Sequence, residues 1–112
     1  MARIFSCSAL GILVCLASLA TPSCLHAQTD AAKVYKANCV LCHSDDGSGS
    51  SPTGKALKAR DLRSDEVQSK TDAELAEVIT KGRGKMPAFG AKLKPDDITR
   101  LVAYVRELPK KK

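Results

Sequence analysis

The stretch Cys39-Val40-Leu41-Cys42-His43 decides how this chain folds and what it can bind. Its pattern, C-x-x-C-H, is the attachment sequence for a c-type haem. On one helical turn the side chains at positions i, i+3 and i+4 share a face, so both thiols and the imidazole can approach one planar ligand. Each thiol can add to a vinyl group of the haem, and His43 can then reach the iron. We therefore expect one covalently bound haem c on Cys39, Cys42 and His43.

Two other uses of a C-x-x-C pair fit this chain less well. A thioredoxin-like redox pair is expected within a βαβ pattern, and this sequence has no strand pattern. A structural zinc site needs four ligands. The chain has five cysteines and two histidines, but all except Cys39, Cys42 and His43 precede residue 28, in a segment that we expect to be removed. The remaining three leave zinc one ligand short.

Residues 1–27 have the features of a secretory signal peptide. A basic residue is followed by an apolar run at 9–20 and then by a short polar stretch. The run is shorter than the about 20 apolar residues that a membrane-spanning helix needs, although an uncleaved N-terminal anchor is the alternative. Cleavage after Ala27 is favoured over cleavage after Ala20. We therefore predict a signal peptide at 1–27 and one domain at 28–112.

The first half of this domain shows helical periodicity. A first helix is predicted over 30–43, with Asp30 as its N-cap. Residues 44–53 are dense in Ser, Asp, Gly and Pro and predict a loop. A short helical turn is expected over 64–69, with Val67 facing inward.

The second half carries clearer helix boundaries. Thr71 and Glu74 form a capping-box pattern that opens a helix, and Gly82 suits its C-terminal end. The last helix is predicted over 95–108, with a proline at its first position and two aspartates behind it. Its buried face should consist of Ile98, Leu101, Val102, Val105 and Leu108.

Residues 82–90 form a loop between the last two helices. Glycines loosen its backbone, and Pro87 keeps Met86 out of the helical region. Within the predicted domain His43 is the only histidine and Met86 the only methionine. Met/His ligation fills both axial positions of a haem iron and raises its reduction potential. We therefore predict His43 and Met86 as axial iron ligands, with Lys85 or an open site as the alternative.

Residues 30–108 resemble a class I monohaem cytochrome c of the small bacterial periplasmic or c6-like kind. The resemblance rests on the C-x-x-C-H motif at 39–43, on Lys-Met-Pro-Ala-Phe-Gly at 85–90 and on Ala-Tyr-Val-Arg at 103–106. It implies an all-α cytochrome c fold, with three to four helices wrapped around one haem and the N- and C-terminal helices crossing.

The same resemblance implies roles for single residues. Tyr35 and Tyr104 would lie near the helix crossing. The carbonyl of Pro52 would accept the Nδ1 proton of His43 and so fix the orientation of the ring. Arg60 would pair with a haem propionate.

The positive charge of the chain, formally +6, bears on its partners. Cations near the predicted ligands could steer the protein to acidic docking patches on redox partner proteins, although a merely solvated surface is the alternative. These cations are Lys55, Lys81, Arg83, Lys85 and Lys92. Because the charge is dispersed and aromatic residues are scarce, nucleic-acid binding is not expected.

Motif, ligand count and resemblance together predict a soluble, exported, monomeric one-electron carrier. No acid, base or nucleophile is paired with an activating partner, so we do not expect an enzyme. The periplasm is the expected location, without stable membrane insertion after signal cleavage; the thylakoid lumen or a membrane anchor are alternatives. The alternative functions are a haem-based sensor with a displaceable Met86, and an electron-transfer subunit of a larger oxidoreductase.

Overall fold

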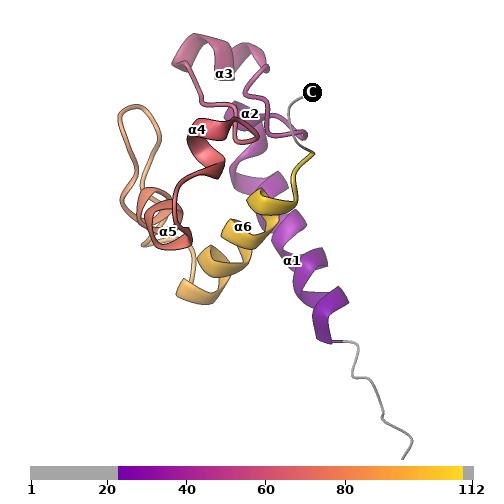
Figure 1. Ribbon diagram of the computed structural model, residues 1–112. Coiled ribbons are helices and arrows are strands. Elements are labelled where there is room, and N and C mark those ends of the chain that lie inside the picture. The colour runs from indigo at the N-terminus through magenta and orange to yellow at the C-terminus, as the bar shows by residue number, and fades with distance from the viewer. Residues whose placement is uncertain (1–22, 110–112) are drawn as a thin grey trace, which may run out of the picture.

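The computed structural model describes residues 23–109, with side chains from Asp30 onward. These residues form six helices and no strand, which confirms the all-α prediction (Figure 1). The helices are α1 (Ser23–Asn38), α2 (Val40–His43), α3 (Pro52–Leu57), α4 (Asp65–Gln68), α5 (Asp72–Lys81) and α6 (Pro95–Glu107). No helix in this part of the chain is long and apolar enough to cross a membrane. Most of the predicted signal peptide at 1–27 lies outside the described residues.

Helix α6 is the element against which the other long helices pack. It begins as predicted, with Pro95 in its first turn and Asp96 and Asp97 behind it. Its predicted buried face is confirmed, because Ile98, Leu101, Val102, Val105 and the C-cap residue Leu108 are all buried. Full burial of one such aliphatic side chain stabilises the fold by about 2 kcal/mol.

One side of α6 crosses α1, as the resemblance implied (Figure 1). Ala31 and Tyr35 of α1 are buried, with 3% and 1% of their surface exposed. The rings of Tyr35 and Tyr104 lie 5.0 Å apart between centroids and are tilted by 44°. The crossing is therefore a packed aromatic and aliphatic contact.

The other side of α6 meets α4 and α5. Val67, Leu75 and Val102 form a cluster there, so Val67 faces inward as predicted. The capping box that opens α5 is also confirmed: the Thr71 hydroxyl accepts from the Glu74 amide, and the Glu74 carboxylate accepts from the Thr71 amide at 2.7 Å. These contacts place the start of α5 against the bundle.

Three boundaries differ from those predicted. Asp30 is not an N-cap, because α1 already begins at Ser23 and no glycine or proline interrupts residues 23–29. The predicted first helix is also divided, since α1 ends at Asn38 and α2 begins at Val40. The loop after His43 is shorter than 44–53, because Ser51 caps α3 and Pro52 is its first residue.

Candidate haem-binding site

The C-x-x-C-H motif forms one helical turn beyond the end of α1. The Cys39 amide still donates to the Tyr35 carbonyl at 2.8 Å, as in a continuing helix. The Cys39 carbonyl in turn accepts from the amides of Cys42 at 3.2 Å and of His43 at 2.8 Å. Cys39 and Cys42 are not joined by a disulfide, and both are half-buried, as is His43. The turn therefore carries both thiols and the imidazole at the spacing that the motif requires.

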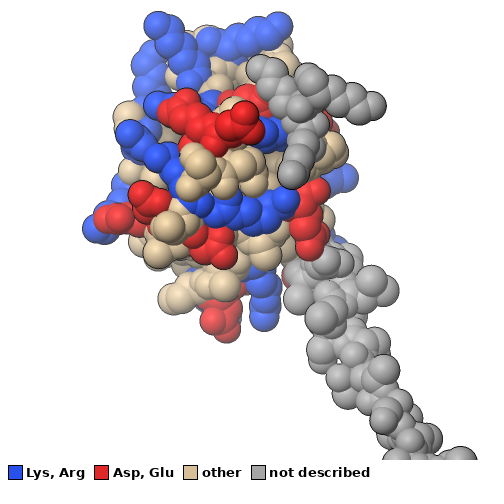
Figure 2. Space-filling model, in the orientation of Figure 1, with Lys and Arg blue, Asp and Glu red and all other residues tan. Residues whose placement is uncertain are grey.

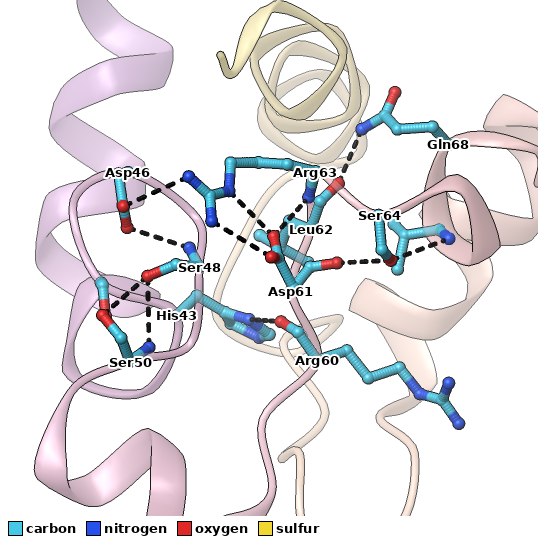
Figure 3. Close-up of polar contacts among 12 residues, drawn as sticks. His43, Asp46, Ser48, Ser50, Arg60, Asp61, Leu62, Arg63, Ser64 and Gln68 are labelled. Atoms are coloured by element: carbon cyan, nitrogen blue, oxygen red, sulfur yellow. Dashed lines mark hydrogen bonds and ion pairs between the residues drawn. The ribbon is translucent and has the colours of Figure 1, made fainter. Parts of the chain in front are cut away.

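His43 is oriented by a main-chain carbonyl. Its Nδ1 lies 3.1 Å from the carbonyl oxygen of Arg60 (Figure 3). With Nδ1 as the donor, Nε2 carries no proton and is the nitrogen available to a metal. Burial lowers the pKa of His43, and the hydrogen bond to Arg60 opposes this only in part. The ring is therefore held in the neutral form that can bind iron.

This hydrogen bond corrects the prediction for Pro52. Pro52 is the first residue of α3, and the carbonyls at the start of a helix point along the helix toward its own later amides. The carbonyl that accepts from His43 instead belongs to Arg60, which follows α3 in irregular backbone. The Ser-Pro pair at the start of α3 is the sequence signal that could have excluded Pro52.

Helix α3 packs directly on the motif turn. The Ser51 hydroxyl accepts from the Gly54 amide at 2.9 Å and donates to the Leu41 carbonyl at 2.7 Å. A β-carbon at Gly54 would come within 2.1 Å of the Cys42 carbonyl oxygen, so only glycine permits this approach of the two backbones. The motif turn is thus bounded on one side by the start of α3.

Tyr35 connects the motif turn to the helix crossing. Its hydroxyl donates to the carbonyl of Ser44, the residue that ends α2, at 2.8 Å. Burial, more than any neighbouring charge, raises the pKa of Tyr35 above its usual value. Tyr35 therefore stays a neutral donor as well as a core aromatic, a second role that the sequence did not reveal.

The pKa of the Cys39 thiol reflects its burial and the charged groups that act on it. Burial raises the pKa of the Cys39 thiol to about 11, and the neighbouring Cys42 contributes in the same direction. Lys92 opposes this shift. Lys92 lies in the segment between α5 and α6, so a positive charge of this segment acts on the Cys39 thiol.

Met86 lies in that segment, in a closed turn. The amide of Arg83 donates to the Met86 carbonyl at 3.1 Å, and the Met86 amide donates back to the Arg83 carbonyl at 3.0 Å. The Phe89 amide donates to the carbonyl of Ile79 in α5 at 3.0 Å. Met86 itself is half-buried. The loop is therefore shaped as predicted, while the role of Met86 as a ligand stays a prediction.

Arg60 contributes its backbone to the site. Its side chain forms an ion pair with Glu66 and is half exposed, and Figure 3 shows it extending away from the His43 ring. The contact of Arg60 with a haem propionate stays a prediction. The main-chain contact to His43 was missed, because no residue pattern identifies an irregular carbonyl as an acceptor.

The donor set fits a covalently attached haem. Two free thiols and an unprotonated Nε2 lie on one turn. The large apolar side chains that are most exposed within residues 30–109 belong to the motif and the helix packed on it: Leu41 is 72% exposed and Leu57 37%. Because Leu41 is at position i+2 from Cys39, it lies on the opposite side of the helical turn from the thiols and the imidazole.

The cations named from the sequence are all exposed; they are Lys55, Lys81, Arg83, Lys85 and Lys92. Figure 2 shows Lys and Arg side chains gathered at the end of the molecule where α3 lies. Elsewhere on that face, acidic and basic side chains alternate.

Known proteins with similar sequences are c-type cytochromes. A cytochrome c6 from Nostoc sp. is 36% identical over 105 residues, which cover 94% of this chain and 92% of the relative. The FixP subunit of a cbb3-type cytochrome c oxidase from Azorhizobium caulinodans is 32% identical over 90 residues, but these cover only 30% of that protein. The solved structure of the KustC0563 c-type cytochrome is 34% identical, with a TM-score of 0.66, over 73% of this chain and 99% of that one.

The family comparison covers most of the described structure. The family described as "Cytochrome C oxidase, cbb3-type, subunit III" matches residues 26–105. That span includes the motif turn, the Met86 loop and nearly all of α6. The chain therefore belongs to the cytochrome c family, among its class I and cbb3-type subunit III domains, and carries one covalently bound haem c.

Proposed function

We propose that this protein is a soluble, exported one-electron carrier of the periplasm whose haem iron is held by His43 and Met86. The observation that carries the proposal is the hydrogen bond from His43 Nδ1 to the Arg60 carbonyl, which leaves Nε2 to bind iron. The closed turn around Met86 and the cytochrome c6 relatives support it. When bound, the haem supplies an iron that cycles between the ferrous and ferric states.

The residues of the chain act by keeping the ligand arrangement constant through that cycle. Cys39 and Cys42 attach the macrocycle covalently to a turn that is already helical. The Arg60 carbonyl prevents His43 from rotating, and the turn closed by Arg83 restricts Met86. Because such a site changes little between its oxidised and reduced states, little energy is needed to rearrange it during electron transfer.

Replacement of Met86 tests the ligand assignment. Met86→Ala should lower the reduction potential and let carbon monoxide bind the ferrous protein, because a sulfur ligand that favours the reduced iron is lost. The measurements are a redox titration and absorption spectra with and without carbon monoxide. Met86→His should instead restore a closed, low-spin site at lower potential. If Met86→Ala changes neither property, Met86 is not the ligand. Carbon monoxide binding by the wild-type protein would favour the alternative function, a haem-based sensor in which the ligand displaces Met86.

An electron-transfer subunit of a larger oxidoreductase is the second candidate, favoured by the FixP relatives. The two candidates are distinguished by the size at which the native protein elutes when a cell extract, prepared without denaturants, is run on a size-exclusion column. Elution as a monomer supports the carrier. Elution with a high-molecular-weight oxidase that survives moderate salt supports the subunit.

Docking on acidic patches of redox partners is part of the same proposal. Lys85→Glu should slow electron transfer to an acidic partner at low salt, and the difference should shrink as salt rises, because exposed charges are screened. Lys94→Glu, a charge reversal outside the named cations, is the control. Equal slowing by both variants would mean that the overall charge, and not a patch, steers the protein.

A further inference from the structure

The carbonyl that accepts from His43 lies in backbone without helix or strand. Residues 58–64 join α3 to α4 as turns and irregular structure. A carbonyl in a helix is directed by the repeating hydrogen bonds of that helix, whereas the Arg60 carbonyl has no such support. A hydrogen bond of 3.1 Å nevertheless needs a well-defined direction at the acceptor. Other contacts must therefore hold this stretch in place.

Backbone contacts supply part of that support. Gly49 packs so closely that a β-carbon there would lie 2.7 Å from the Ala59 carbonyl oxygen. Its φ of +70° is also one that other residues rarely adopt. The Leu62 amide donates to the Gly47 carbonyl at 2.8 Å. The loop that follows His43 therefore lies directly against the stretch that carries Arg60.

The side chain of Arg63 supplies further support for the stretch that carries Arg60. Its Nε donates to Asp61 Oδ1 at 2.9 Å, and its Nη2 donates to Asp61 Oδ2 at 3.1 Å. Its Nη1 reaches Asp46 Oδ2 at 3.4 Å (Figure 3). The side chains of Arg63 and Asp61 are each 19% exposed, so water competes weakly for the bidentate pair.

Arg63 thus bridges Asp61 and Asp46, and the positions of these two carboxylates along the chain give the bridge a function. Asp61 directly follows Arg60, and Asp46 lies three residues after His43. One guanidinium therefore joins the chain next to the acceptor to the chain next to the donor. The Asp61 carbonyl is held as well, because it accepts from the amide and hydroxyl of Ser64 at 3.1 Å and 2.7 Å. Loss of the guanidinium would free the Arg60 carbonyl to turn.

We propose that Arg63 is a positioning residue for His43, acting through the Asp61–Arg63–Asp46 bridge on the direction of the Arg60 carbonyl. The inference rests on the proposed role of His43 as an axial ligand. A well-directed Nδ1–H···O bond fixes the ring and makes the imidazole a more basic ligand. A more basic ligand favours ferric iron and lowers the reduction potential. The planar fork of arginine is needed, because lysine offers a single point of charge.

The test is Arg63→Lys in the holoprotein, which keeps the charge and removes the fork. The NMR signal of the His43 Nδ1–H should shift and exchange faster with water, and the reduction potential should rise. Arg106→Lys is the matched control: Arg106 also donates to a carboxylate, Asp72, at 3.0 Å and to the Gln68 carbonyl at 2.8 Å, and its side-chain hydrogen bonds among the described residues go to residues 68–72 rather than to residues 58–64. It should lower the melting temperature and leave the Nδ1–H signal and the potential unchanged.

The proposal is overturned if Arg63→Lys leaves both properties unchanged or moves them no more than Arg106→Lys does. Where Arg63→Lys yields too little holoprotein, Asp46→Glu takes its place. It keeps the charge and alters the exposed end of the bridge, together with the hydrogen bond that Asp46 Oδ1 accepts from the Ser48 amide at 3.0 Å. A smaller shift in the same direction supports the proposal, and none overturns it. Failure of the His43 assignment is seen separately, because the wild-type ferric protein would then show no paramagnetically shifted His43 signal.

Discussion

Two halves of this molecule are held together by different interactions. The packed half, made of α1, α5 and α6, has buried apolar side chains such as Tyr35 and Leu101, each 1% exposed. The motif half, residues 39–64, contains α2, which has no buried residue, and α3, whose only buried residue is Gly54. It is shaped instead by hydrogen bonds and close backbone approach, as between Ser51 and Leu41.

The difference indicates which half depends on the haem. Apolar burial stabilises the packed half without a cofactor, because it removes side chains from water. Each hydrogen bond of the motif half contributes only about 1 kcal/mol net. The motif half, whose two helices bury almost no apolar side chains, is therefore expected to depend on the bound macrocycle for its stability. The following variants test this division, from the largest expected effect to the smallest.

Removal of the haem should disorder the motif half first. In a variant carrying both Cys39→Ser and Cys42→Ser, amides of α2 and α3 should lose nearly all protection from hydrogen exchange, while those of α6 keep measurable protection. Native-state hydrogen exchange by NMR is the measurement. The variant with Cys39→Ser alone, which keeps one thioether, should lie between. Uniform loss of protection in both halves would contradict the division.

Truncation of one leucine in each half compares them directly. Leu101→Ala should reduce the free energy of unfolding of the holoprotein by about 3 kcal/mol, because it leaves a cavity in the packed half. Leu41→Ala should reduce it by less than about 0.5 kcal/mol, because this side chain is 72% exposed. Both values come from denaturant unfolding followed by circular dichroism. Similar losses would contradict the division, because they would show that Leu41 is packed as tightly as Leu101.

Gly54 tests whether backbone approach supports the motif half. Gly54→Ala should cost about 2 kcal/mol, because its β-carbon would lie 2.1 Å from the Cys42 carbonyl oxygen and would push α3 away from the motif turn. Thermal unfolding of the holoprotein measures the loss. Ala56→Ser, on the exposed face of the same helix, serves as the control and should change little. An unchanged melting temperature for Gly54→Ala would mean that α3 is not packed as closely as described.

The capping box of α5 gives the smallest effect and a pH dependence. The Thr71 amide and hydroxyl hold the pKa of Glu74 below its usual value. A lowered folded pKa means that the stabilisation is present above the unfolded pKa, about 4.3, and is lost as the pH falls through the folded value. Glu74→Gln should remove this part of the acid sensitivity while keeping an acceptor for the Thr71 amide. The measurement is the free energy of unfolding of the wild type and of Glu74→Gln at pH 7 and pH 3. An equal change with pH in the two proteins would exclude this contribution of Glu74.

The sequence predicted the packed half well, because local chemistry determines it. A capping box at Thr71 and Glu74, a proline at position 95 and apolar residues at helical spacing each require only nearby residues to take effect. The motif turn and the closed loop at Met86 were predicted for the same reason. In these regions the local pattern and the tertiary fold agree.

The motif half was predicted less well, because its contacts join distant backbone groups. The acceptor for His43 lies 17 residues away in an irregular stretch, and Pro52 was assigned that role by likeness alone. The packed half contains one wrong boundary, since Asp30 is not an N-cap because α1 already begins at Ser23. Residues that act through a carbonyl, such as Arg60, leave no side-chain signature in a sequence.

The hydrogen bond between His43 and Arg60 also bears on protein design. The five residues of the haem motif can be copied into any helical bundle, but the group that orients their histidine arrives only with α3 and the chain beyond it. Tyr35, whose hydroxyl donates to the carbonyl of Ser44 beside His43, would have to be moved too. The smallest segment that carries the motif together with the groups that orient His43 is therefore 35–63, nearly six times as long as the motif itself.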